Sequence, residues 1–232
     1  TSGVNWGMKI MPIQGSSGLE STVLKSYGYA LEMRALYDST NGAKGAFVVA
    51  TNASFGIDYG DPASYPLWCA FYDSLGAYGI LNSAATSNSN INVDVSGDVP
   101  TTCVSDYIIA VNNTNRTDNK ATSGFGSTHI DLGAPGSTIY STLPNNNYGT
   151  RSGTSQSAPA VAGAIGFMHA VACSNFASLY KSNASLPFLA KVTFEILFFL
   201  NNILANSIIA LSSSAYKILI LFIPTYPLFI AI

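Results

Sequence analysis

Apolar and polar positions in the first part of the chain follow two alternating periodicities. Residues 8–13, "MKIMPI", form a short apolar run that predicts a buried strand. Residues 18–42 carry apolar side chains at helical spacing up to a stop at Asn41 and Gly42. The same alternation then continues with a strand over 45–56, a helix over 65–79 and a strand over 79–90. Strands that alternate with helices are typical of a parallel sheet with crossover helices, so the pattern predicts an α/β fold.

Two of the predicted strands end in small and amide residues. The second strand passes into Asn52, Ser54 and Gly56, and the third passes into a loop that contains Asn88. Ligands of open parallel sheets bind beyond the carboxyl ends of the strands. We therefore expect the loops of Ser54 and Asn88 to form the walls of a site.

The last part of the chain differs in composition from the rest. All twenty glycines lie at or before Gly166, and residues 194–232 are dominated by apolar side chains with only two charges. Three interpretations stay open for this segment: an out-of-frame or artefactual tail, a membrane hairpin, or native core helices. We therefore expect one domain over residues 1–175 and a separate segment of uncertain origin over 176–232.

Composition excludes some functions and leaves the state of the cysteines open. Only 9% of residues are charged and the formal net charge is −2, so the chain has no basic face for nucleic acid. Its many amide and hydroxyl residues are typical of exported proteins, and we expect a secreted monomer. Of three cysteines, Cys69 and Cys103 form either a disulfide or two buried thiols, and the odd count leaves at least one unpaired.

Shorter predicted strands over 105–115 and 129–143 precede a helix that begins near Ser155, in "GTSQSAPAVAG". A serine at this position either caps the helix or acts as a nucleophile. The nucleophile needs a general base and donors for an oxyanion, and a helix N-terminus supplies free N–H groups and a favourable dipole. We expect Pro159 in the first turn, where its missing N–H has no intrahelical acceptor.

The segment "GTSQSAPAVAG" resembles the nucleophile motif GTSxxxPxVxG of the subtilisin-like serine peptidases. "NASFG" is similar to the NxSLG segment of that family, and Ala84 to Asn88 are similar to its AAxGN segment. "DLGAPG", from Asp131 to Gly136, resembles its APG turn. The resemblance extends from about residue 3 to about residue 170 and implies a three-layer subtilisin-like fold, here incomplete, with a mainly parallel sheet flanked by helices.

The resemblance also implies roles for individual residues. Ser155 is expected to be the catalytic serine and Asn88 the amide that donates to the oxyanion. Residues expected to bind the substrate backbone or line the specificity pocket are Ser54, Phe55, Gly56, Ala85, Thr86, Ser87, Gly153 and Thr154. Ser87 departs from the family pattern, which has glycine there, and it is expected to narrow the pocket wall.

The acid and histidine of a catalytic triad are missing from the motifs. No DTG, DSG or HGT segment occurs, and the only histidines are His129 and His169. His129 and Asp131 are two apart on a predicted strand, so they lie side by side, whereas the acid must lie behind the histidine. We interpret both histidines as structural residues and expect a chain that begins just after the catalytic histidine of the family.

Metal binding has weak support in the sequence. The resemblance allows for bound calcium, but no DxDxDG loop occurs. Turn capping through their own backbones is the expected role of five acidic residues: Asp58, Asp61, Asp94, Asp98 and Asp106. We assign no metal ligand.

The sequence therefore predicts a secreted serine endopeptidase that acts on polypeptides through an acyl-enzyme on Ser155. Without a histidine and acid, this chain is expected to be inactive alone. Two alternatives stay open. One is a non-catalytic peptide-binding domain built on the Ser54 and Asn88 loops. The other is a membrane-tethered protein that uses residues 194–232.

Overall fold

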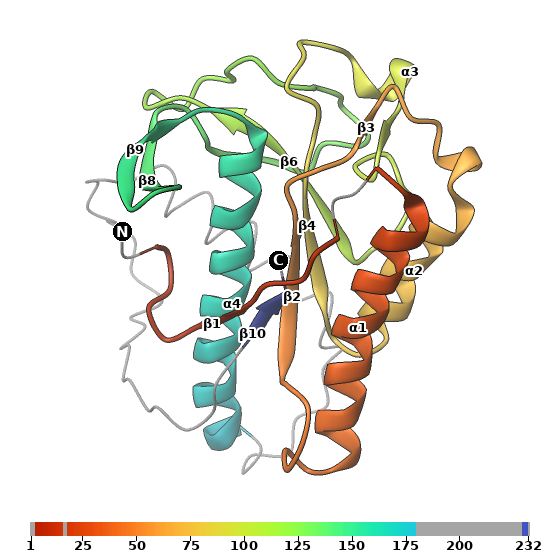
Figure 1. The fold of residues 1–232 in the computed structure, drawn as a ribbon, viewed down its shortest axis with the longest axis vertical. Helices are drawn as coiled ribbons and strands as arrows, with labels where there is room; N and C mark the ends of the chain where they lie inside the picture. The colour runs from red at the N-terminus through yellow and green to blue at the C-terminus, as the bar shows by residue number, and fades with distance from the viewer. Residues whose placement is uncertain (1–2, 16–17, 180–228, 232) are drawn as a thin grey trace.

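A six-stranded sheet forms the middle of three layers (Figure 1). The structure, a computed structural model, describes residues 3–15, 18–179 and 229–231. The strands run in the order β1-β10-β2-β4-β6-β7, and each neighbouring pair is parallel. They are β1 (Lys9–Met11), β2 (Val48–Ala53), β4 (Leu81–Ala85), β6 (Ile108–Thr114), β7 (Leu132–Pro135) and β10 (Phe229–Ala231). The predicted parallel sheet is therefore confirmed.

Helices cover both faces of this sheet. In Figure 1, α1 (Glu20–Ser39) and α2 (Pro66–Gly76) lie on one side, and α4 (Thr154–Leu179) lies on the other. A single-turn helix, α3 (Val93–Ser96), and a 3-10 turn, η1 (Pro62–Ser64), lie in the loops. The three-layer arrangement expected from the sequence is thus present in the described residues.

Two further strand pairs lie outside the main sheet. The antiparallel pair β3 (Ile57–Asp58) and β5 (Asp98–Val99) lies beyond the carboxyl end of β2. A hairpin of β8 (Ile139–Leu143) and β9 (Asn147–Arg151) precedes α4. The pattern predicts β8 but not β9, because "NYGTR" has no apolar alternation.

The core forms two clusters, one on each face of the sheet. Every residue of β2 is buried, which is usual for a central parallel strand. Val48 packs in the cluster with α1 and α2, whereas its neighbour Val49 packs in the cluster with α4. Ala158, Val161, Ala162 and Ile165 give α4 a small-residue face toward the sheet. The helix that carries Ser155 is therefore held closely against the central strands.

The predicted end of the first helix is confirmed by the backbone. Asn41 and Gly42 adopt φ values of +49° and +82°, in the left-handed region that ends helices. The Gly42 N–H donates to the Tyr37 carbonyl at 2.8 Å, which satisfies one of the free carbonyls of the last turn.

β10 joins the sheet between β1 and β2, where Ile230 is in register with Ile10 and Ala50. Residues 180–228 and 232 lie outside the described residues, so most of the apolar segment over 194–232 does too. Within the part of the chain that the structure describes, no helix is long and apolar enough to cross a bilayer. The division near residue 175 stays a prediction.

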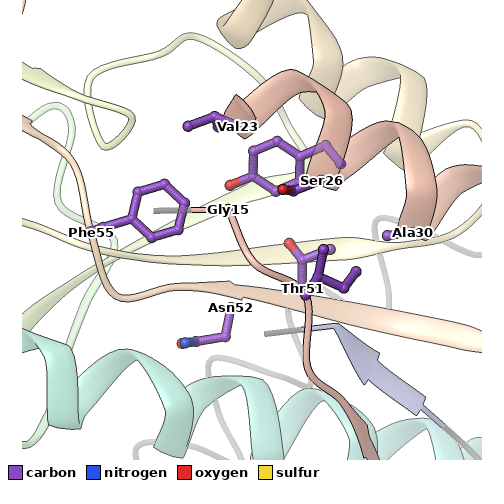
Figure 2. Close-up of a pocket in the computed structure, with 9 residues that line it drawn as sticks. Gly15, Val23, Ser26, Ala30, Thr51, Asn52 and Phe55 are labelled. Atoms are coloured by element: carbon purple, nitrogen blue, oxygen red, sulfur yellow. The ribbon is translucent and has the colours of Figure 1, made fainter. Parts of the chain in front are cut away.

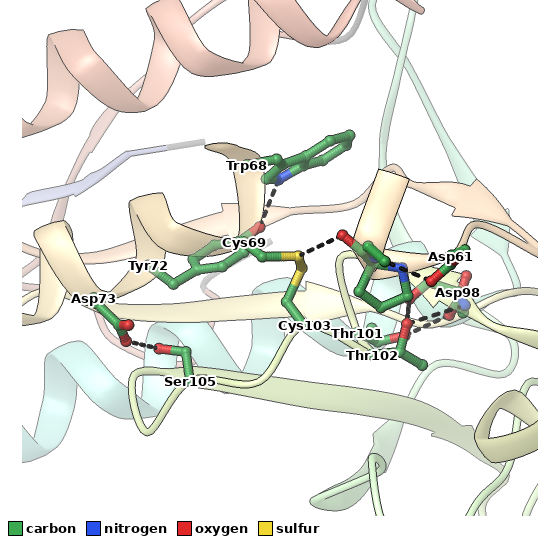
Figure 3. Close-up of a disulfide and its surroundings, with 12 residues drawn as sticks. Asp61, Trp68, Cys69, Tyr72, Asp73, Asp98, Thr101, Thr102, Cys103 and Ser105 are labelled. Atoms are coloured by element: carbon green, nitrogen blue, oxygen red, sulfur yellow. Dashed lines mark hydrogen bonds between the residues drawn. A yellow bond between two sulfur atoms is a disulfide. The ribbon is translucent and has the colours of Figure 1, made fainter. Parts of the chain in front are cut away.

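A disulfide joins Cys69 of α2 to Cys103 (Figure 3). The sequence left open either a disulfide or two buried thiols, and the structure has the disulfide. The two cysteines are 34 residues apart in sequence. Cys103 ends a turn in which its N–H donates to the Pro100 carbonyl and the Thr102 N–H donates to the Asp98 carbonyl. The bridge therefore fixes the Asp98 turn against α2.

Removing this bridge should destabilise the fold. Closing a loop of this length lowers the entropy of the unfolded chain, worth about 3–4 kcal/mol in the free energy of unfolding. We expect the double variant Cys69→Ala/Cys103→Ala to lose about 2–4 kcal/mol in urea unfolding. Dithiothreitol should lower the stability of the parent chain toward that of the variant and leave the variant unchanged. Equal losses in both proteins would contradict a stabilising bridge.

Candidate active site

The N-terminus of α4 is tied by hydrogen bonds to the ends of the neighbouring strands. The Thr154 hydroxyl donates to the Thr86 carbonyl at 2.6 Å, and the Ser83 hydroxyl donates to the Ala158 carbonyl at 2.9 Å. Two further bonds reach the β7 side: the Ser157 hydroxyl donates to the Ala134 carbonyl and the Gly153 N–H to the Gly136 carbonyl, both at 2.9 Å. The first turn of the helix therefore has a fixed position beyond β4 and β7.

Ser54 and Ser155 exchange hydrogen bonds across 101 residues of sequence. The Ser155 hydroxyl donates to the Ser54 carbonyl at 3.2 Å, and the Ser54 hydroxyl donates to the Ser155 carbonyl at 2.9 Å. The helix begins at Thr154, so the expectation that Pro159 lies in the first turn is wrong. Since proline has no N–H, the Ser155 carbonyl four residues earlier lacks its helical donor. The Ser54 hydroxyl replaces that donor.

Asn88 lies directly beside the helix start. Its Oδ1 accepts from the Thr154 N–H at 3.0 Å and from the Thr154 hydroxyl at 3.1 Å. The Nδ2 of the same amide is therefore on the side away from Thr154, with its protons available to another acceptor. Gly153 has φ +149°, and a Cβ there would lie 2.8 Å from Asn88 Oδ1, so only glycine allows this approach.

A cavity opens next to Ser155. Its lining consists of Ser54, Phe55, Gly56, Asp58, Ala85, Thr86, Ser87, Asn88, Asp98, Thr154 and Ser155. The structure thus brings together all of the sequence-predicted site residues except Gly153, which lies against Asn88 instead. Asp58 and Asp98 also line the cavity, although their sequence pattern is that of turn residues.

Ser87, where the family pattern has glycine, is buried in the cavity wall. Its N–H donates to Asp98 Oδ2 at 2.9 Å, and its hydroxyl accepts from the Ser89 N–H at 3.0 Å. The Ser87 carbonyl also accepts from the Gly124 N–H. The strand end that leads to Asn88 is therefore held from three sides.

A second cavity lies between α1 and the end of β2 (Figure 2). Its walls are mostly apolar, with Val23 and Ala30 of α1 facing Thr51 and Phe55. Asn52 also lines it, and the Oδ1 of Asn52 is buried without a hydrogen bond from the described residues. Phe55 lines this cavity and the one at Ser155.

Neither histidine of the sequence is a partner of Ser155. His129 Nδ1 lies 2.9 Å from Asp94 Oδ1, and Asp131 Oδ2 accepts from the Ala110 N–H at 2.7 Å, so the two are not a pair. His169 is on α4, 14 residues after Ser155, which is about 21 Å along the helix axis. Burial, then the nearby Arg34, lowers the pKa of His169 to about 4, so it stays neutral.

Asp94 binds a distant loop, so the prediction that it caps its own turn is wrong. Its carboxylate accepts from the N–H groups of Ser127, Thr128 and His129, at 2.7–3.1 Å, and contacts the His129 ring. Burial alone would raise the pKa of Asp94, but these hydrogen bonds outweigh it and lower the pKa to about 2. Asp94 thus ties α3 to the segment before β7.

The described residues hold no group of three or more His, Cys, Asp or Glu side chains arranged to bind a metal ion. The calcium that the resemblance allows therefore finds no cluster of three such side chains among residues 3–15, 18–179 and 229–231.

A double-mutant cycle tests the hydrogen bond from the Ser54 hydroxyl to the Ser155 carbonyl. Ser54→Ala leaves the Ser155 carbonyl without a donor, and we expect a loss of about 1–3 kcal/mol in the free energy of unfolding. Pro159→Ala restores the helical N–H, so the same Ser54→Ala change should cost about 1 kcal/mol less in that background. Ser157→Ala, whose hydroxyl donates to Ala134, is the matched control and should cost the same in both backgrounds. Equal costs for Ser54→Ala would contradict the proposed replacement.

Acid should weaken the Asp94 tether. The folded-state pKa of about 2 lies below the ordinary value of 3.8, so the stabilisation is complete above pH 4 and disappears as the pH falls toward 2. We expect the parent chain to lose more stability than Asp94→Asn between pH 5 and pH 2.5 in urea unfolding. Asp106→Asn, at an exposed site, should follow the parent chain. Parallel losses in all three proteins would show that Asp94 does not contribute.

Known proteins are similar to this chain in sequence. The model of the subtilase family matches residues 1–181. Thermitase from Thermoactinomyces vulgaris is 49% identical over 61 residues, which are 26% of this chain and 22% of thermitase. Subtilisin-like protease 2 from Plasmodium falciparum is 29% identical over 147 residues, 63% of this chain and 11% of that protein. Subtilisin-like protease 10 from Arthroderma otae is 39% identical over 95 residues, 40% of this chain and 23% of that protein.

A solved structure shares the arrangement of elements. The crystal structure of a cold adapted subtilisin-like serine proteinase matches with a TM-score of 0.52 and 23% identity, over 80% of this chain and 55% of that chain. This likeness concerns the fold, and the chain spans less than a quarter of each of the curated relatives named above. Because the family model matches more than half of the residues, the chain belongs to the subtilase family.

Proposed function

We propose that this chain carries the nucleophile, the oxyanion site and the substrate-side-chain pocket of a serine endopeptidase that hydrolyses polypeptides. The observation that carries the proposal is the position of Ser155, at the start of α4 and in the wall of a cavity that Asn88 also lines. Family membership supports a serine peptidase in general terms.

In this proposal the Ser155 hydroxyl attacks the carbonyl carbon of the scissile peptide. The hydroxyl proton passes to a general base, and the carbonyl oxygen becomes an oxyanion. Asn88 Nδ2 and the Ser155 N–H donate to this oxygen. Two features support them: the Thr154 bonds hold Asn88 Oδ1 away from it, and first-turn N–H groups lack intrahelical acceptors.

The substrate backbone would lie along the Ser54 to Gly56 segment. Phe55, Ala85, Thr86 and Ser87 would form the walls of the side-chain pocket, since these residues line the same cavity as Ser155. Gly153 and Thr154 would position the Asn88 amide. Gly153 leaves room for its oxygen, and the Thr154 N–H donates to that oxygen.

The general base and its acid would be residues that are not among the 232. Both histidines of the sequence lie elsewhere, His129 in a bond to Asp94 and His169 four turns along α4. The chain alone would therefore show at most the residual stabilisation of an oxyanion site without its triad. The disulfide supports an oxidising, extracellular location.

A non-catalytic peptide-binding role is the second candidate. The observation that favours it is the absence of a histidine partner for Ser155 within the described residues, which leaves the cavity and the strand ends intact for binding. A membrane-tethered role would depend on residues 194–232, nearly all of which lie outside the described residues.

Chemical rescue with imidazole separates the two candidates. Free imidazole can accept the Ser155 proton in place of the histidine, while p-nitrophenyl acetate supplies an acyl group too small to need the side-chain pocket. We expect imidazole to produce a Ser155-dependent release of nitrophenol, with acetyl transfer to Ser155 detected by mass spectrometry. Asn88→Ala should lower this rate about 10²- to 10³-fold, the loss measured for the oxyanion amide of subtilisin.

Ser155→Ala gives the background reaction of imidazole itself. Ser152→Ala, an exposed serine three residues earlier, is the matched control and should behave as the parent chain. If Ser155→Ala and the parent chain release nitrophenol at the same rate, Ser155 is not a nucleophile and the binding role replaces the peptidase role.

A further inference from the structure

Two carboxylates face each other in the cavity beside Ser155. Asp58 of β3 and Asp98 of β5 are direct partners in the antiparallel register, and both line the cavity. Like charges directly opposite each other on a strand pair are destabilising. Among the described residues, no Lys, Arg or His side chain lies within ion-pair distance of Asp58 or Asp98, so no described cation neutralises this pair.

Asp98 is deeply buried, with only 2% of its surface exposed. Its Oδ2 accepts three hydrogen bonds, from the Thr101 hydroxyl at 2.5 Å, the Thr86 hydroxyl at 2.6 Å and the Ser87 N–H at 2.9 Å. Figure 3 shows Asp98 beside Thr101 and Thr102 on the turn that the disulfide fixes. Its Oδ1 accepts no hydrogen bond from the part of the chain that the structure describes.

A buried carboxylate that faces a second carboxylate is costly unless a positive group approaches the pair. Burial raises the pKa of Asp98, the three hydrogen bonds oppose that rise, and the charge of Asp58 adds to it. A cation placed between the two carboxylates would offset both the cost of burying Asp98 and the repulsion between Asp98 and Asp58. Calcium and magnesium take six or more oxygen ligands, and the described residues bring no third carboxylate, histidine or cysteine to the pair.

The position of the pair relates it to the substrate. Asp98 Oδ2 binds the N–H of Ser87, the residue directly before Asn88, so the carboxylate lies on the side-chain wall next to the oxyanion amide. Consider the substrate residue whose carbonyl carbon lies at the Ser155 hydroxyl. If its side chain enters the cavity, it would contact Asp98 and Asp58. Guanidinium and ammonium groups on long apolar stems fit such a place, because the stem packs while the charged end pairs.

We infer that the cavity beside Ser155 selects a substrate residue with a positively charged side chain, arginine or lysine, immediately before the scissile bond. Asp98 and Asp58 are the specificity-determining residues. The inference rests on the proposed function, because it uses the substrate position that Ser155 and Asn88 define. It names a substrate class that neither the family nor the motifs specify.

Peptide binding to the whole chain tests this inference without turnover. The probes are three fluorescein-labelled tetrapeptides that differ only in the last residue: arginine, citrulline or leucine. Citrulline has nearly the shape of arginine but no charge. We expect fluorescence anisotropy to give an affinity for the arginine peptide at least about tenfold above that for the citrulline peptide.

Three variants locate the charge. Asp58→Asn, at an exposed position, and Asp98→Asn should each reduce the ratio of arginine to citrulline affinity several-fold. Asp106→Asn removes the same charge at an exposed site outside the cavity, and should leave the ratio unchanged. Because Asp98→Asn removes a buried group, its fold is checked by circular dichroism, and Asp58→Asn decides the question if Asp98→Asn unfolds.

The outcomes separate this inference from the proposed function. Equal affinities for arginine and citrulline, or a preference for leucine, would overturn the acidic pocket while leaving a peptide site at Ser155. An unchanged ratio in Asp58→Asn would also overturn the pairing. If none of the three peptides binds, the peptide site itself fails, and this inference fails with it.

Discussion

The orphaned carbonyl of Ser155 is the constraint on which the site depends. Pro159 has no N–H, so the carbonyl four residues before it must find a donor outside the helix, and Ser54 is that donor. The bond joins the end of β2 to the start of α4 across the whole middle of the chain. Since Ser155 returns a hydrogen bond to Ser54, the orientation of the proposed nucleophile and the position of the segment proposed to bind the substrate are set together. A proline in a helix thus links two parts of one site.

Close packing around glycine and hydroxyl residues completes this geometry. Gly153 leaves room for the Asn88 oxygen, and Thr154 binds that oxygen with both its N–H and its hydroxyl. The same threonine hydroxyl donates to the end of β4. The small polar residues of the motif therefore have structural roles. They satisfy backbone N–H and C=O groups that are left free where the strand ends meet the start of the helix.

The regular elements could be predicted from the sequence, whereas contacts between distant segments could not. The central strands are short apolar runs that end in small and amide residues, and the Asn41 and Gly42 stop is a local signal. Strands β3 and β5 have two residues each, too few for any period, so Asp58 and Asp98 had the pattern of turn residues. Asp58 lies opposite Asp98, and Asp94 accepts hydrogen bonds from the segment before β7. Both are tertiary contacts that have no local signal in the sequence. The roles implied for Ser155 and Asn88 rest on motifs and stay proposals.

Asp98 supports the fold through its hydrogen bonds and also carries the charge of the proposed specificity pocket, so a substitution there changes both. One oxygen accepts hydrogen bonds from Thr86, Ser87 and Thr101, and so supports the strand end that carries Asn88. A change at Asp98 would therefore disturb the proposed oxyanion amide together with the proposed side-chain pocket. Asp58 lies opposite it and makes no side-chain hydrogen bond with the described residues, so it contributes charge without supporting the fold. Because the disulfide fixes the same turn to α2, the proposed specificity pocket is held both by this bridge and by the hydrogen bonds of Asp98.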